Sequence, residues 1–201
     1  FLPGLFYAFI LLTASLFPQI GLAGKPPTSS PKSTRQFIAS ILPEIESINN
    51  DILADRDKLL TLETKFERKE ALTSKELSFL TSLASRYNLK NPNFKSKGTW
   101  EDLELRVDII PPSLAIAQAA TESGWGKSRF ATQGNNLFGH SCFVRGCGIA
   151  PKTKASQPKP KYEAKKFSSI NESVRSYVQN LNTHSAYAGL RKLRYQARQK
   201  D

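Results

Sequence analysis

The stretch PPSLAIAQAATESGWG, residues 111–126, contains a short helix and the turn that ends it. Proline followed by serine is typical of a helix start. We predict a helix over residues 113–121, small and apolar enough to be buried nearly all round. Gly124 and Gly126 open the chain after it, which places Glu122 at the C-terminal end of the helix.

Glu122 is the first candidate for chemistry. Partial burial and the negative end of the helix dipole would both favour its neutral form. A neutral carboxylic acid at working pH is what a general acid must be. The alternative is a glutamate without a catalytic role, satisfied by backbone donors or by Lys127 or Arg129.

Beyond this helix the pattern changes to a small β-lobe and then returns to helix. Residues 141–167 mix Gly, Pro, Lys and both cysteines, with short alternation over 162–167, so we predict a hairpin there. Ser169 and Glu172 have the spacing of a capping box, which predicts a further helix after the hairpin.

The residues before position 96 predict amphipathic helices. Apolar residues recur mostly at steps of three and four between Phe37 and Phe66, with an interruption expected at Pro43. We interpret residues 35–95 as a helical support region. The predicted fold class is α+β, mainly helical with a small β-hairpin lobe, preceded by N-terminal helices.

The N-terminus has the pattern of an export signal. Residues 5–17 are apolar, too short a run to span a bilayer comfortably but suited to a secretory core segment. Small residues before position 24 predict a signal peptide over 1–23, followed by a linker over 24–34. The alternatives are a buried core helix and an uncleaved membrane anchor. Export predicts a periplasmic or cell-wall location, with no stable membrane span after the signal is removed.

Composition excludes several classes of function. Two Cys and two His are too few for a four-ligand zinc site of the usual kind, and we predict no metal site. No GxGxxG or GxxxxGK[ST] loop is present, so we expect no nucleotide chemistry and no cofactor. In an oxidising compartment Cys142 and Cys147 could form a disulfide, with two free thiols as the alternative.

The positive charge is concentrated in one part of the chain. The whole formal net charge of +12 comes from residues 127–201, which contain 15 Lys and Arg and three acidic residues. Such a balance favours a polyanionic partner. We do not expect nucleic acid, because no recognised nucleic-acid motif is present and export argues against it.

Two motif blocks carry a family resemblance. QAATESGWGKS at 118–128 and GNNLFG at 134–139 resemble the bacterial glucosaminidase family of peptidoglycan hydrolases. CFVRGC at 142–147 and NLNTHSAY at 180–187 carry a narrower resemblance, to the Bax-type periplasmic proteins of Gram-negative bacteria.

This resemblance implies a lysozyme-like domain over residues 96–201, expected to be truncated at its C-terminus, with a glycan groove between a helical lobe and a β-lobe. It implies that Glu122 is the general acid that protonates the leaving oxygen of a β-1,4 bond after N-acetylglucosamine. The partner is then the glycan strand of peptidoglycan. In that family a second carboxylate in the β-lobe and a tyrosine also shape the site, and Tyr187 matches the tyrosine.

Elimination leaves one candidate for the second carboxylate. After Glu122 the acids are Glu163, Glu172 and Asp201. Glu172 is explained by its capping box and Asp201 ends the chain, so we assign Glu163. The alternative for Glu163 is an ordinary exposed strand residue among lysines.

The remaining site candidates each have a structural alternative. Asn135 and Asn136 are predicted to bind sugar hydroxyl or acetamido groups, although asparagine is equally a turn former. Trp125 could stack on a sugar, but burial is the other interpretation. Tyr187 is either a substrate-site residue or a helix-packing one.

The sequence therefore predicts an exported endo-β-N-acetylglucosaminidase that acts on peptidoglycan. A lytic transglycosylase with the same acid is the first alternative. A non-catalytic cell-wall binding or scaffold protein is the second, although the presence of Glu122 gives no sign of a lost site. Protein partners are left open.

Overall fold

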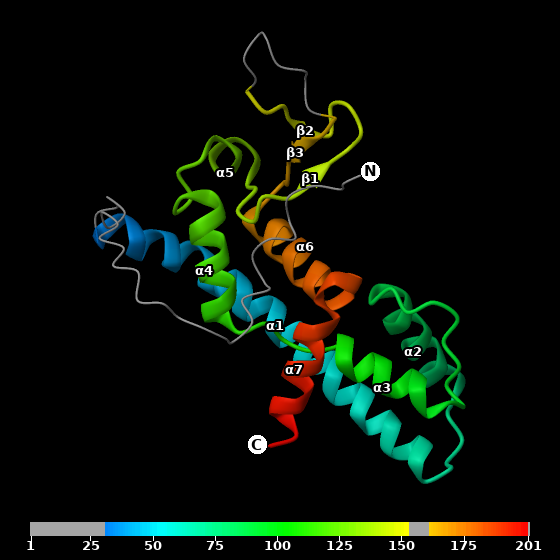
Figure 1. The fold of residues 1–201 in the computed structure, drawn as a ribbon. Helices are drawn as coiled ribbons and strands as arrows, with labels where there is room; N and C mark the ends of the chain where they lie inside the picture. Colours follow the sequence, from blue (N-terminus) through cyan, green and yellow to red (C-terminus); the bar gives the residue numbers. More distant parts are fainter. Residues whose placement is uncertain (1–30, 153–160, 201) are drawn as a thin grey trace, which may run out of the picture.

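The computed structural model describes residues 31–152 and 161–200, so the predicted signal peptide lies outside the described residues. In chain order the elements are α1 (Pro31–Glu67), α2 (Ser74–Arg86), α3 (Lys97–Arg106), α4 (Pro112–Ser123), α5 (Arg129–Gly134), β1 (Ser141–Cys142), β2 (Gly148–Ile149), β3 (Glu163–Lys165), α6 (Ile170–Thr183), the 3-10 helix η1 (Ser185–Tyr187) and α7 (Ala188–Arg198). The strands lie together at one end of the molecule, and α2 and α3 lie at the other (Figure 1).

α1 is the helix against which most of the others pack. Its predicted apolar face is buried, which confirms the amphipathic helix: Phe37, Ile41, Ile45, Ile48, Ile52, Leu59 and Leu62. The helix continues through Pro43, so the interruption expected there is wrong. A proline inside a helix costs roughly 3 kcal/mol, and the complete burial of Ile41 and Ile45 on either side offsets that cost.

The predicted helical support region, residues 35–95, and the residues after it share one hydrophobic core. α1 contacts α4 and α6 as well as α2 and α3. Trp100 on α3 is fully buried and stacks on Phe66 of α1, with ring centroids 5.4 Å apart. The helix also begins at Pro31, inside the stretch 24–34 that was expected to be a linker.

The β-lobe is a three-stranded antiparallel sheet rather than a simple hairpin. β3 lies in the middle, with β1 and β2 on either side of it. Gly148 of β2 is close to the central strand, because a Cβ there would lie 2.0 Å from the carbonyl oxygen of Ala164. The α+β class is confirmed: the chain is mainly helical and carries one small sheet.

Asp108 fixes α7 to the rest of the molecule. Its side chain is 2% exposed and forms ion pairs with Arg194, at 3.3 Å, and Arg198, at 2.5 Å. Arg194 also donates to the backbone carbonyl of Leu105 and to Oδ1 of Asn182. Burial alone would raise the pKa of Asp108, but the hydrogen bond from Arg198 and the nearby arginine charges outweigh burial and hold that pKa below its usual value.

Within the described residues, no helix is both long enough and apolar enough to cross a membrane.

Candidate active site

Glu122 lies on the open side of α4, one residue before the helix ends. The buried face consists of Ala115, Ala119, Ala120 and Ser123. The expectation that α4 is buried nearly all round is therefore wrong, because only the face that packs in the core is covered. The Glu122 side chain is exposed and accepts a hydrogen bond from Nε2 of Gln118 at 3.3 Å. The partial burial predicted for this carboxylate is absent.

The turn after Glu122 has an unusual backbone. Gly124, Trp125 and Gly126 follow one another with φ of 58°, 59° and 74°, and a left-handed tryptophan is uncommon. A Cβ on Gly126 would lie 3.0 Å from the ring of Phe37. The half-buried ring of Trp125 packs edge-on against Phe37, with centroids 5.8 Å apart. Trp125 thus anchors the turn to α1, which leaves only part of its ring for a sugar.

Ser123 holds the same turn from the inside. Its hydroxyl is buried, donates to the carbonyl oxygen of Ala119 at 2.6 Å and accepts from the N–H of Gly126 at 2.7 Å. Its own carbonyl accepts from the N–H of Ser128 at 2.9 Å. These bonds fix the backbone that follows Glu122, so the carboxylate projects from an ordered turn.

Asn135 and Asn136 differ in how many hydrogen bonds their side chains form within the protein. Asn135 has a left-handed backbone at the end of α5 and donates to the carbonyl oxygen of Phe167 at 3.0 Å. Asn136 is buried; its amide nitrogen donates to the carbonyls of His140 and Lys165, and its oxygen accepts from the N–H of His140. Asn136 thus joins the loop to β3, which leaves Asn135 as the better candidate for sugar contact.

Glu163 is engaged by the disulfide loop beside it. Cys142 and Cys147 form a disulfide, as the sequence predicted. The Glu163 carboxylate accepts from the N–H of Gly146 at 3.1 Å and from that of Gly148 at 2.8 Å. The hydrogen bond from Gly146, then that from Gly148, lowers the pKa of Glu163. Glu163 is therefore held as an anion and is poorly suited to donate a proton.

Among the described residues, one group of side chains has possible metal-ligand atoms that lie close together. It consists of Cys142, Cys147 and Glu163. Both sulfur atoms are already used in the disulfide. Thiolates, not disulfide sulfurs, are the usual metal ligands, so the oxidised chain offers only the carboxylate here.

Removing the Glu163 carboxylate tests its hold on the loop. In Glu163→Ala we expect amide exchange at Gly146 and Gly148 to accelerate about tenfold, because hydrogen bonds to a charged acceptor are lost. The N–H of Lys165, which bonds the carbonyl of His140 across the sheet, is the internal control and should change little. Unchanged exchange at both glycines, measured by NMR, would show that the carboxylate does not order the loop.

Tyr187 ends η1 and is partly buried against the core. Its ring lies edge-on to that of His184, with centroids 6.2 Å apart. Burial raises the pKa of the neighbouring Tyr177, and the proximity of Tyr187 adds to that rise. Tyr187 therefore has a packing role, and its remaining exposed part is what a substrate could reach.

A row of aromatic rings, which sequence reasoning missed, joins the β-lobe to the helices. Phe167 lies 5.7 Å from His140, His140 lies 6.4 Å from Phe138, and Phe138 stacks on Tyr177 at 4.0 Å. Burial, then the charge of Lys165, lowers the pKa of His140 to about 4, so its imidazole is neutral at neutral pH. The sequence contained no sign of this row, because two of its three contacts, Phe167–His140 and Phe138–Tyr177, join residues far apart in the chain.

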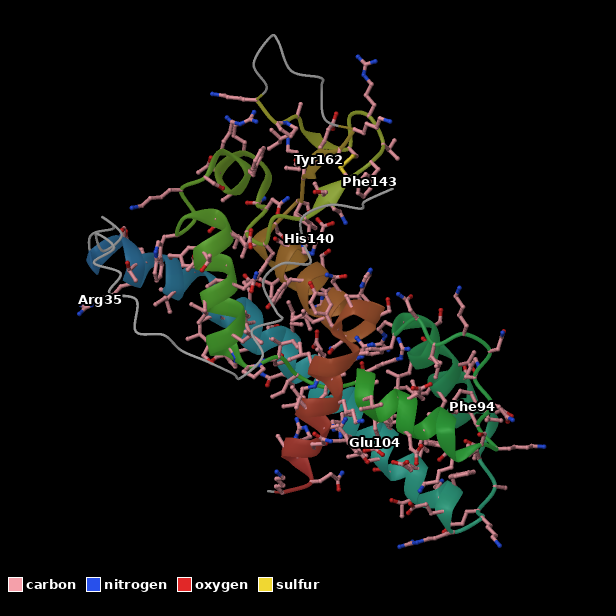
Figure 2. The ribbon with its side chains drawn as sticks, in the orientation of Figure 1. Arg35, Phe94, Glu104, His140, Phe143 and Tyr162 are labelled. Carbon is pink, nitrogen blue, oxygen red and sulfur yellow. A yellow bond between two sulfur atoms is a disulfide. The ribbon has the colours of Figure 1, made fainter. Side chains whose placement is uncertain are left out.

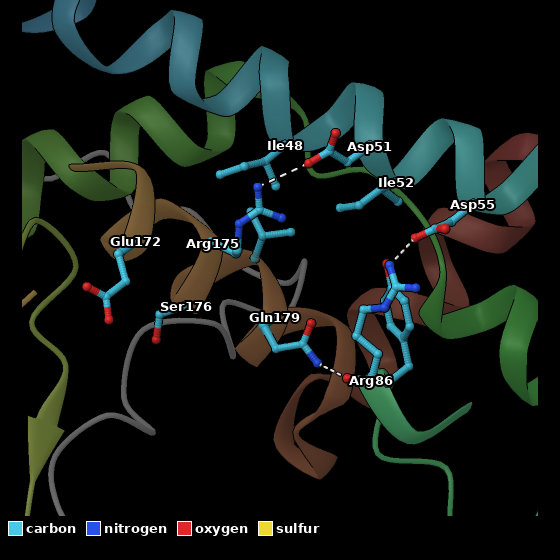
Figure 3. A pocket seen from close by; sticks show the side chains of 11 residues that line it. Ile48, Asp51, Ile52, Asp55, Arg86, Glu172, Arg175, Ser176 and Gln179 are labelled. Carbon is cyan, nitrogen blue, oxygen red and sulfur yellow. Dashed lines mark hydrogen bonds and ion pairs between the residues drawn. The ribbon is translucent and has the colours of Figure 1, made fainter. Parts of the chain in front are cut away.

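A separate hollow of about 360 Å³ lies between α1, α6 and the end of α2 (Figure 3). Ile48 lies on its wall. The ion pair between Arg175 and Asp51, at 3.0 Å, and that between Arg86 and Asp55 cross its rim. None of the predicted site residues lines it. It is therefore distinct from the candidate active site.

The predicted residues are brought together in part. The loop that holds Asn135 and Asn136 is tied to β3, the strand of Glu163. Glu122 comes from α4 in the helical lobe, and Tyr187 comes from η1 after α6. Glu122 and Glu163 thus come from the helical part of the domain and from the sheet, respectively.

The helical domain with its small three-stranded antiparallel sheet is consistent with the lysozyme-like α+β class. The chain belongs to the glucosaminidase family: the model of that family, described as mannosyl-glycoprotein endo-beta-N-acetylglucosaminidase, matches residues 97–200. The match covers all the predicted site residues.

Two curated proteins are similar to the chain. Protein bax of Escherichia coli (strain K12) is 39% identical over 178 residues, which are 88% of this chain and 60% of that protein. Exo-glucosaminidase LytG of Bacillus subtilis (strain 168) is 35% identical over 74 residues, 35% of this chain and 26% of that protein. The chain thus spans about 60% of the length of the first and 26% of the second. No solved structure matches the chain significantly.

Proposed function

We propose that the chain is an exported peptidoglycan hydrolase, an endo-β-N-acetylglucosaminidase that uses Glu122 as its general acid. The observation that carries the proposal is the exposed Glu122 carboxylate at the end of α4, on a turn fixed by Ser123, within the residues that the family model matches. The family's description supports the choice of bond, a β-linkage after N-acetylglucosamine.

The two carboxylates have environments that favour different roles. Glu122 is exposed and accepts a hydrogen bond from Gln118, so its carboxyl group is accessible to a glycosidic oxygen, to which we propose that it donates a proton as the bond to the anomeric carbon breaks. Two backbone N–H groups keep Glu163 ionised, so its carboxylate is suited to stabilise positive charge on the sugar ring. We assign Glu122 as the acid and Glu163 as the anionic partner.

The nucleophile depends on the distance between the carboxyl groups in the complex. Separations of roughly 5–5.5 Å accompany retention through a protein nucleophile, and roughly 6.5–9.5 Å accompany inversion by water. In a third route the substrate's own acetamido oxygen attacks the anomeric carbon as the leaving oxygen departs. Water then opens the cyclic intermediate that this attack forms. Tyr187 is proposed to contact that acetamido group, and Asn135 and Trp125 to contact neighbouring sugars.

Export is the second part of the proposal. A disulfide persists in oxidising compartments and is rare in the cytosol, so the Cys142–Cys147 bond supports a periplasmic or cell-wall location. The basic residues 127–201 suit a wall whose peptide stems carry carboxylates.

Exo-action is the second candidate function. It is favoured by one observation, the similarity to a protein named an exo-glucosaminidase. An exo-enzyme releases single sugars from chain ends, whereas an endo-enzyme shortens strands from the start.

Digestion of purified sacculi by the full chain tests the bond and the mode of action together. We expect soluble muropeptides with N-acetylglucosamine at the reducing end, seen by mass spectrometry, and rapid shortening of the glycan strands. Release of single sugars with little shortening would replace endo- by exo-action. Products that end in anhydro-N-acetylmuramic acid, lighter by one water, would establish the transglycosylase alternative. Binding without any release would favour the scaffold alternative.

A further inference from the structure

Two aromatic side chains stand exposed on the β-lobe. Phe143 is 79% exposed and Tyr162 is 45% exposed. Cys142 of β1 pairs with Glu163 of β3; Phe143 directly follows β1 and Tyr162 directly precedes β3. Figure 2 shows both on this lobe, above His140. The paired ends of two strands thus present two rings to solvent.

The loop that carries Phe143 is constrained at several points. The Cys142–Cys147 disulfide closes it, and the Glu163 carboxylate binds its backbone at Gly146. The N–H of Cys147 donates to the carbonyl of Val144 at 3.1 Å. A side chain on such a loop has less freedom left to lose on binding, so it is a better anchor than one on a mobile loop.

We propose that Phe143 and Tyr162 form a saccharide-binding platform that holds a glycan strand away from the bond that is cleaved. Aromatic rings offer a flat apolar surface to the C–H face of a sugar, and the tyrosine hydroxyl adds a hydrogen-bonding group. Arg145 and Lys161, both exposed, flank the pair and suit the carboxylates of peptide stems. The choice of glycan rests on the proposed function.

An anionic lipid surface is the competing partner for an apolar loop with basic neighbours. One feature favours the glycan. The two rings extend the paired ends of β1 and β3, so two separate segments of the chain present them, whereas insertion into a bilayer uses a single protruding apolar loop.

The test measures binding in a background that cannot turn over substrate. Binding of N-acetylchitohexaose to the full chain carrying Glu122→Gln is followed by calorimetry. We expect Phe143→Ala and Tyr162→Ala each to weaken binding about tenfold, the scale for loss of an anchor side chain. Val144→Ala is the matched control: Val144 is 75% exposed in the same loop but has no ring, so binding should stay within about twofold.

The outcomes separate this proposal from the proposed function. Unchanged binding in both aromatic variants would overturn the platform. Binding to phosphatidylglycerol vesicles that falls in Phe143→Ala and Val144→Ala alike, with no ring-dependent glycan binding, would overturn it in favour of a lipid surface. If the unsubstituted chain hydrolyses no sacculi but ring-dependent binding persists, the platform stands and the hydrolase proposal fails.

Discussion

Glu122→Gln is expected to lower kcat/KM on peptidoglycan by about 10² to 10⁴, the range that positioned general acids contribute. The amide has nearly the same shape but has no proton to donate to the leaving oxygen. Because the side chain is exposed and, among the described residues, accepts one hydrogen bond, from Gln118, the substitution should leave the stability of the fold unchanged. Binding to sacculi should also persist.

The matched control is Glu101→Gln. Glu101 is exposed on α3, forms an ion pair with Lys97 one turn away, and lies outside the proposed site. It should retain full activity on sacculi, measured as the release of soluble muropeptides. Equal rates for Glu122→Gln and the unsubstituted chain would remove Glu122 as the acid.

Asp108→Asn is expected to destabilise the protein by about 3 kcal/mol or more, because it leaves buried arginine charge without its partner. For a domain of this size that lowers Tm by roughly 10 °C. Asp51→Asn is the control: its pair with Arg175 is more than half exposed on both sides, so its loss should cost about 1 kcal/mol or less. Thermal unfolding followed by circular dichroism compares the two, and equal Tm values would contradict the role of Asp108 in fixing α7.

The same carboxylate gives stability a defined dependence on pH. The folded-state pKa of Asp108 is lowered, so the folded protein binds its proton less readily than the unfolded chain does. The contribution of Asp108 is therefore fully present above the unfolded pKa, near 3.9, and is lost as pH falls through the lower, folded value. In Asp108→Asn the loss of folding stability that protonation of Asp108 causes at low pH should disappear.

The sequence predicted best where one local pattern determined the structure. The isoleucines of α1 repeat with helical spacing, and Ser169, whose spacing to Glu172 predicts a helix start, is the N-cap of α6. The helix through Pro43 was missed, because tertiary burial of Ile41 and Ile45 overrides the local preference of proline. The strands have only two or three residues, too few for alternation to reveal their order.

Within the candidate site, the sequence suggests which residues act but not the environment of each. Glu122 is proposed from its neighbours in the sequence, whereas its exposure depends on which face of α4 meets the core. Asn136 and His140 acquire their surroundings from β3 and Phe167, about 30 positions further along the chain. Such contacts exist only after the lobes pack, and a single sequence does not contain them.

Reducing ends released from sacculi test the central claim most directly. The unsubstituted chain and Glu122→Gln are incubated side by side with purified sacculi, and the new ends are reduced and identified by mass spectrometry. Hydrolysis by this acid predicts reduced N-acetylglucosamine ends from the unsubstituted chain and a background level from Glu122→Gln. The same ends at the same rate from both proteins would contradict it.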